Sequence, residues 1–142
     1  VRKKTQILCE KEFKKLGCDT EVSTDDGSRG FKGKVTDLLK DFLLKNLRTK
    51  EPKNIIYGCG PRPMLREISR ISAEYDIPAQ ISLEEHMACG IGACLGCVVK
   101  IRRQKSEDRN QKKQNSGDFE YVRVCKEGPV FQAQDIIWEV KP

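Results

Sequence analysis

Three cysteines and three glycines lie within nine residues of this chain, in the stretch HMACGIGACLGC, which runs from His86 to Cys97. The cysteines have the spacing C-x4-C-x2-C, and Cys125 follows after 27 intervening residues. A loop can bring three thiols to one centre only if its backbone curls tightly. Gly90, Gly92 and Gly96 permit that curl, because glycine adopts positive φ without steric cost.

The number and spacing of these cysteines favour a [2Fe–2S] cluster, whose two bridged irons need four thiolates. Backbone N–H groups of such a loop can point at sulfur and offset part of the negative charge of the cluster. One structural zinc ion is an alternative, although zinc cysteines usually come as two close pairs. Disulfides or free thiols are a third possibility. The expected ligands are Cys89, Cys94, Cys97 and Cys125.

Composition excludes several other classes of protein. The chain has 142 residues, 34% of them charged, a size and balance that suit one globular domain or two small ones. No apolar run reaches the ~18 residues of a membrane span, so we expect a cytoplasmic protein with no membrane contact. Residues 102–117 hold six Lys/Arg and two Asp/Glu, hence +4 of the net +6. No groove-reading motif accompanies this charge, so we expect no nucleic-acid partner.

Hydrophobic periodicity predicts alternating helices and strands over residues 5–83. Helices are expected at 5–16, at 35–47 and from Pro61 to about Tyr75, and strands at 18–26, 53–59 and 79–83. This alternation is typical of an α/β fold with a parallel sheet. Further on, 97–103 and 119–125 are expected to form the arms of a hairpin, with the polar tract 104–117 at its tip and Cys125 on its far arm. A last strand is expected at 135–140.

The turn YGCGP, residues 57–61, joins a predicted strand to a predicted helix. In an open α/β sheet this place is a ligand crevice, where glycines allow the close approach of a ring or a phosphate. Taken alone the turn is weak evidence, because many such turns contain glycine for geometry only. Of the remaining cysteines, Cys9 and Cys18 are expected to be small core residues, and His86 is expected to be structural.

Several segments together resemble one known family. IIYGCGPRPML is similar to the signature of ferredoxin–NAD(P) reductase-like nucleotide domains. STDDGSRGFKGKVTDLL, ISLEEHMACGIGACLGCVVK and YVRVCKEGPVF resemble the electron transfer subunits of NAD-linked dihydroorotate dehydrogenases. The resemblance implies an α/β chain. Residues 1–80 would be part of a parallel-sheet, reductase-like NAD-binding domain. Residues 81–142 would be a small β-rich [2Fe–2S] domain with a polar insertion at about 102–117.

The resemblance also implies cofactors and a partner. In that family FAD exchanges hydride with NAD, and the cluster passes single electrons between this FAD and the FMN of a catalytic subunit that oxidises dihydroorotate in pyrimidine synthesis. Carried over by position, the cluster ligands would be the four cysteines above. The nicotinamide side of the pocket would be lined by Gly58, Cys59, Gly60 and Pro61, and a neighbouring loop would contain Thr24, Asp25, Gly27 and Gly30.

Two departures from the family pattern shape the expectation. The usual FAD-binding barrel and the first Gly-rich phosphate loop have no counterpart in the sequence, so we expect an N-terminally truncated chain that is inactive alone. The spacer between Cys97 and Cys125 is longer and more polar than is usual in the family. The alternatives are a subunit of another flavin and iron–sulfur oxidoreductase, and a zinc-stabilised interaction domain.

Overall fold

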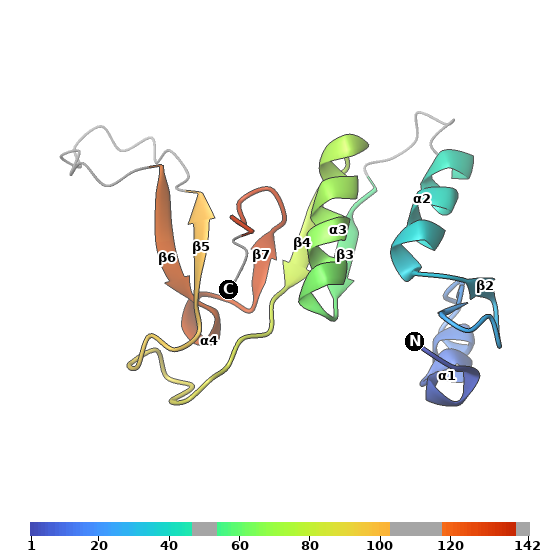
Figure 1. The fold of residues 1–142 in the computed structure, drawn as a ribbon, viewed down its shortest axis with the longest axis horizontal. Helices are drawn as coiled ribbons and strands as arrows, with labels where there is room; N and C mark the ends of the chain where they lie inside the picture. The colour runs from blue at the N-terminus through green and yellow to red at the C-terminus, as the bar shows by residue number, and fades with distance from the viewer. Residues whose placement is uncertain (47–53, 103–117, 139–142) are drawn as a thin grey trace. The chain divides into compact units, whose positions relative to one another are not determined.

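The computed structural model describes residues 1–46, 54–102 and 118–138 of this mixed α/β chain (Figure 1). Two compact units divide it, Val1–Pro52 and Lys53–Pro142. Within the described ranges, no helix has the length and apolar character needed to cross a bilayer.

The first unit contains a 3-10 turn and two helices beside a pair of very short parallel strands. The predicted helix at 5–16 is interrupted, because Cys9 has a left-handed backbone with φ of 58° and α1 begins only after it. The predicted strand at 18–26 is reduced to two residues, and Cys9 and Cys18 are exposed, so their assignment to a core was wrong. The elements are η1 (Lys4–Gln6), α1 (Glu10–Lys15), β1 (Ser23–Thr24), β2 (Phe31–Lys32) and α2 (Val35–Asn46).

The second unit is built on a three-stranded sheet with the order β3-β4-β7. β3 (Ile56–Cys59) and β4 (Ala79–Ser82) are parallel and are connected through α3 (Arg62–Glu74), as the alternating pattern predicts. α3 begins directly after Pro61, because proline is tolerated where a helix needs no backbone donor. The core of this unit includes Leu65, Ile68 and Ile71 of α3 and Ile81 of β4, all of them buried.

β7 (Val130–Gln132), which the sequence pattern did not predict, pairs antiparallel with β4 and places Phe131 opposite Ile81. The predicted boundary near residue 80 falls inside β4. The division into a nucleotide-binding part and a cluster part stays a prediction.

A two-stranded antiparallel hairpin completes the second unit (Figure 1). β5 (Val98–Arg102) pairs with β6 (Phe119–Arg123), as expected, and the polar tract 104–117 lies outside the described residues. The expected strand at 135–140 was wrong for its described part, where Ile136 forms only an isolated bridge to Ile101. Cys125 is not on a hairpin arm but in α4 (Val124–Glu127), a single turn that follows β6 directly.

Candidate metal centre

The cysteine loop, residues 84–97, joins β4 to β5 and is mostly exposed. Gly90 and Gly92 have φ of 67° and 81°, which supplies the expected curl. Gly96 does not have a positive φ, and Leu95 takes that conformation instead with φ of 57°. A Cβ at position 96 would lie 3.4 Å from Cys94 Sγ, an ordinary contact distance, so the space at this position does not by itself require glycine.

The four predicted ligands lie in two pairs. The thiol of Cys89 interacts with that of Cys94, and the thiol of Cys97 interacts with that of Cys125. α4 brings the distant Cys125 to the loop, because the Val124 backbone N–H donates to the Cys97 carbonyl over 3.1 Å. The two pairs are neighbours, because Cys94 and Cys97 are three residues apart in the loop, and Arg123, two residues before Cys125, donates to the carbonyl of Gly92 between Cys89 and Cys94. The chain thus presents two adjacent two-thiol sites.

Backbone N–H groups point at these sulfurs, as the curled loop predicts. Cys89 Sγ accepts from the N–H of Ala93 at 3.3 Å and from that of Cys94 at 3.4 Å. Cys94 Sγ accepts from Gly96 at 3.4 Å, and Cys97 Sγ accepts from Cys125 at 3.5 Å. Such donors stabilise sulfur that carries negative charge, which is the form that binds metal.

The pKa values of the thiols follow from these contacts. The N–H of Cys94, followed by other donors of the loop, lowers the pKa of Cys89 to about 6. The N–H of Cys125 is the main cause of the lowered pKa of Cys97. The pKa of Cys125 is raised, first by its hydrogen bond with Cys97 and then by burial. In the second pair, Cys97 is therefore poised to ionise before Cys125.

The ion pair between Arg123 and Glu127, which was not predicted from the sequence, connects the cysteine loop to α4. Arg123 Nη1 donates to the carbonyl of Gly92 over 2.8 Å, and Arg123 Nε donates to Glu127 Oε2 over 3.1 Å. The available signal was an Arg and a Glu four residues apart around Cys125, which is the spacing of a helical ion pair.

Within the described ranges, no set of side chains, the four cysteines included, is gathered around the position of a single metal ion. Among those residues, no three His, Cys, Asp or Glu side chains come close enough together to hold one metal ion. His86 is exposed in the cysteine loop, and its structural role stays a prediction. The pairwise arrangement of thiols thus fits two irons with two thiolates each better than it fits a single ion.

The glycine turn lines a small hollow of about 150 Å³ at the carboxyl ends of β3 and β4. Of the four predicted residues, Gly58 and Cys59 line it and Gly60 and Pro61 do not. Gly60 is required in the turn, since φ is 146° and a Cβ there would lie 2.6 Å from Met64 Cε. The remaining lining residues are Tyr57, Gln80, Ser82 and Val130.

The predicted loop of the first unit is ordered by Thr24, which is fully buried. Its hydroxyl donates to the Arg29 carbonyl over 2.8 Å and accepts from the Arg29 N–H over 3.1 Å. Gly27 and Gly30 both have positive φ, and Asp25 is exposed.

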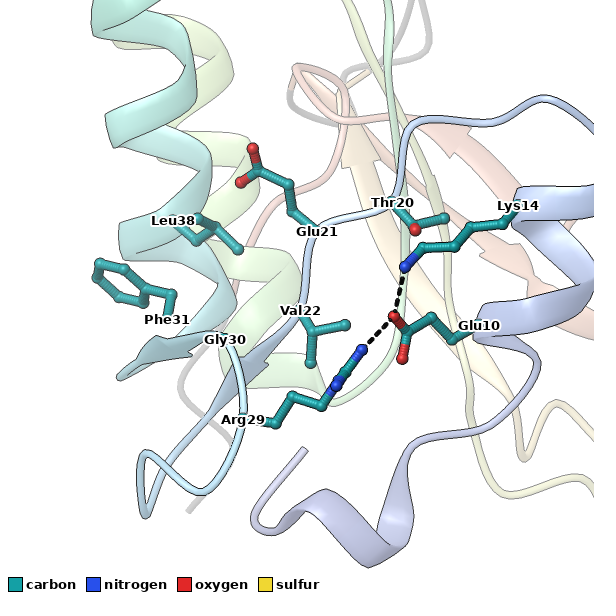
Figure 2. Close-up of a pocket in the computed structure, with 9 residues that line it drawn as sticks. All are labelled: Glu10, Lys14, Thr20, Glu21, Val22, Arg29, Gly30, Phe31 and Leu38. Atoms are coloured by element: carbon teal, nitrogen blue, oxygen red, sulfur yellow. Dashed lines mark hydrogen bonds and ion pairs between the residues drawn. The ribbon is translucent and has the colours of Figure 1, made fainter.

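A cavity of about 370 Å³ lies beside this loop (Figure 2). Neither Thr24 nor Asp25 nor Gly27 lines it. Its cations are already engaged, because Glu10 Oε1 accepts from Lys14 Nζ at 2.8 Å and from Arg29 Nη2 at 2.7 Å. The cavity is therefore a poor site for an anion. Its lining residues are Glu10, Lys14, Thr20, Glu21, Val22, Arg29, Gly30, Phe31 and Leu38.

The cysteine-containing part is similar to a known domain family. Residues 84–137 match the family described as the iron–sulfur cluster binding domain of dihydroorotate dehydrogenase B. Nearly the whole chain matches proteins named dihydroorotate dehydrogenase B (NAD(+)), electron transfer subunit. The one from Desulforamulus reducens is 40% identical over 97% of this chain, and the one from Caldanaerobacter subterraneus subsp. tengcongensis is 42% identical over 96%. The chain spans 46% and 47% of their respective lengths, about half of each relative.

The fold has a solved counterpart. A chain from the structure of an NADH-dependent reduced ferredoxin–NADP oxidoreductase superposes with a TM-score of 0.69 at 28% sequence identity. The match covers 96% of this chain and 42% of the other. Sequence and structure therefore both relate this chain to proteins that are named for electron transfer or for oxidoreductase activity.

Proposed function

This chain is a homologue of the electron transfer subunits of dihydroorotate dehydrogenase B, and from that premise we propose that it relays electrons through a [2Fe–2S] cluster. Cys89, Cys94, Cys97 and Cys125 would hold the cluster. When bound, the cluster supplies reversible one-electron transfer, which lets two-electron and one-electron carriers communicate.

The observation that carries this proposal is the arrangement of the thiols in two adjacent pairs with backbone donors aimed at sulfur. Each pair suits one iron of a two-iron centre, and the N–H groups hold the thiolates and offset their charge. The loop itself is exposed, so a redox partner can approach it closely.

In the whole protein, the proposal places FAD and NAD on the reductase-like part and an FMN-containing dihydroorotate dehydrogenase subunit against the cluster part. Gly58, Cys59, Gly60 and Pro61 would form the nicotinamide side of the pocket, and Thr24, Asp25 and Gly27 a neighbouring loop. Support for the first group is the hollow at the carboxyl ends of β3 and β4, which Gly58 and Cys59 line. The pathway would be pyrimidine synthesis, in a cytoplasmic hetero-oligomer.

The first experiment is anaerobic purification followed by visible spectroscopy. We expect a reddish-brown protein whose broad absorption bleaches when dithionite is added. A colourless protein with one zinc per chain would contradict the proposal and favour the zinc-stabilised interaction domain.

The second experiment identifies the partner. The whole protein is mixed with the FMN-containing dehydrogenase, and bleaching of the cluster by dihydroorotate is followed under anaerobic conditions. Bleaching is the expected result. A coloured protein that forms no complex, or a complex in which dihydroorotate leaves the cluster oxidised, would assign the chain to another flavin and iron–sulfur oxidoreductase.

A further inference from the structure

We propose that Arg123 is a positioning residue that clamps the two thiol pairs together and raises the reduction potential of the cluster between them. This inference rests on the proposed function, because it concerns the cluster that the four cysteines would hold. It adds a residue of β6 that contributes no ligand.

The clamp joins the two segments that carry the thiols. On one side, Arg123 Nη1 donates to the carbonyl of Gly92, which lies in the loop between Cys89 and Cys94. On the other side, the guanidinium makes two hydrogen bonds to Glu127, and the Arg123 backbone N–H donates to Glu127 Oε2 over 2.7 Å. Glu127 ends the single turn that carries Cys125. One side chain therefore bridges both thiol pairs.

Close packing leaves little freedom at this contact. Gly92 is buried, and a Cβ at that position would lie 3.1 Å from Lys126 Cδ and 3.4 Å from Arg123 Nη1. The Arg123 and Glu127 side chains are only 29% and 33% exposed. A three-point contact in this setting restricts the loop more strongly than an exposed ion pair does.

The charge of Arg123 acts on the same centre. Arg123 lies two residues before Cys125 and pairs across the hairpin with Val98, the residue after Cys97, and its guanidinium contacts Gly92 between Cys89 and Cys94. The cation therefore lies within electrostatic range of these sulfurs. Reduction adds one electron to the cluster and no proton, so the reduced state is more negative by one charge. A nearby cation stabilises that state and raises the potential, and the carboxylate of Glu127 offsets part of the effect.

The test uses this chain, reconstituted with iron and sulfide under anaerobic conditions. Iron content and midpoint potential are measured for the parent chain, Arg123→Gln, Arg123→Lys and Glu127→Gln. Arg70→Gln is the matched control, because it also removes one arginine with carboxylate partners, Glu67 and Glu74, but on the surface of α3.

For Arg123→Gln we expect a lower midpoint potential. At a fixed applied potential the ratio of reduced to oxidised cluster should be about tenfold smaller, which corresponds to a decrease of ~59 mV in the midpoint potential of a one-electron couple. Glu127→Gln leaves the guanidinium uncompensated and is expected to raise the potential. Arg123→Lys keeps the positive charge but cannot make the several hydrogen bonds of the guanidinium. Its reduction potential should therefore stay closer to that of the parent chain, while a chelator removes its iron faster. Arg70→Gln should match the parent in both measurements.

Equal potentials in the parent, Arg123→Gln and Glu127→Gln would overturn the electrostatic role. Shifts of the same sign in the two variants would also overturn it, because they would reflect a loosened loop alone. If Arg123→Gln holds no iron but keeps its far-UV circular dichroism, the clamp is supported and Glu127→Gln decides the sign. A parent chain without iron would refute the proposed function itself, which separates that failure from a failure of this inference.

Discussion

At the scale of single residues, the predicted ligands differ from the other cysteines in the hydrogen bonds that backbone N–H groups donate to their sulfur atoms. Cys89 and Cys97 have lowered pKa values because neighbouring N–H groups point at them. Cys9, Cys18 and Cys59 are exposed, and they lie on other parts of the chain. We therefore expect every cysteine that binds iron to lie in the cysteine loop or in α4.

Replacement of Cys125 by serine should abolish the cluster, because it removes one of four thiolates and leaves one iron under-ligated. We expect iron per chain to fall by at least about tenfold after reconstitution and desalting. Cys18→Ser removes an exposed thiol of the first unit and should leave iron content unchanged. Equal iron in Cys125→Ser and the parent chain would exclude Cys125 as a ligand.

Glu10 gives the first unit a pH-dependent stability. Hydrogen bonds from Lys14 and Arg29 lower its pKa from 4.5 to about 2. A depressed carboxyl pKa stabilises the folded state above the unfolded value, and this contribution is lost as the pH falls from about 4.5 toward 2. Glu10→Gln should therefore lower the Tm at pH 7 and have little effect near pH 2. A Tm difference that persists unchanged at low pH would contradict this role.

The residue-level chemistry was only partly visible in the sequence. Cysteine spacing and loop glycines indicated a set of four thiols, because ligand number and loop length are local properties. Their role as cluster ligands stays a prediction. Arg123 and Glu127 were missed, since their role depends on β6 lying against the loop, and that contact joins residues 31 positions apart. The positive φ of Leu95 was also missed, because only glycine signals such a backbone in a sequence.

At the scale of elements, β4 is the centre of the second unit. It pairs with β3 on one side and β7 on the other, and its carboxyl end leads into the cysteine loop. α3 and the β5–β6 hairpin follow local periodicity and were predicted correctly. β7 was missed because three residues are too few for a periodic signal and its partner, β4, lies about 50 residues earlier in the chain.

Ile81 of β4 is fully buried, so its truncation tests the packing of this sheet. Ile81→Val should lower the free energy of unfolding by about 0.5–1.5 kcal/mol and Ile81→Ala by about 2–5 kcal/mol, because each leaves a cavity. Ile55→Val, at a position 47% exposed, is the control and should change it by no more than about 0.5 kcal/mol. Urea unfolding followed by circular dichroism measures all three, and equal values for Ile81→Ala and Ile55→Val would refute the packing.

At the scale of the whole molecule, the cysteine loop combines a candidate redox centre with exposed apolar side chains. Met87, Ile91 and Leu95 are 50%, 78% and 61% exposed. Apolar side chains grouped on one loop are typical of surfaces that contact another protein. In the proposed function, this loop faces the FMN-containing subunit.

Ile91→Asp in the whole protein should weaken the complex with that subunit at least about tenfold, or ~1.4 kcal/mol, because it places a charge in an apolar contact. Leu8→Asp is the matched control, since Leu8 is 82% exposed in the first unit. Titration calorimetry gives both Kd values. An unchanged Kd for Ile91→Asp would mean that the partner binds elsewhere.

The proposed electron relay requires that the paired thiols of Cys89, Cys94, Cys97 and Cys125 hold two irons. Quantification of iron, acid-labile sulfide and zinc in anaerobically reconstituted chain tests this most directly. We predict two irons and two sulfides per chain and no bound zinc. A chain that holds one zinc and no sulfide, or that holds neither iron nor sulfide after reconstitution, would contradict it.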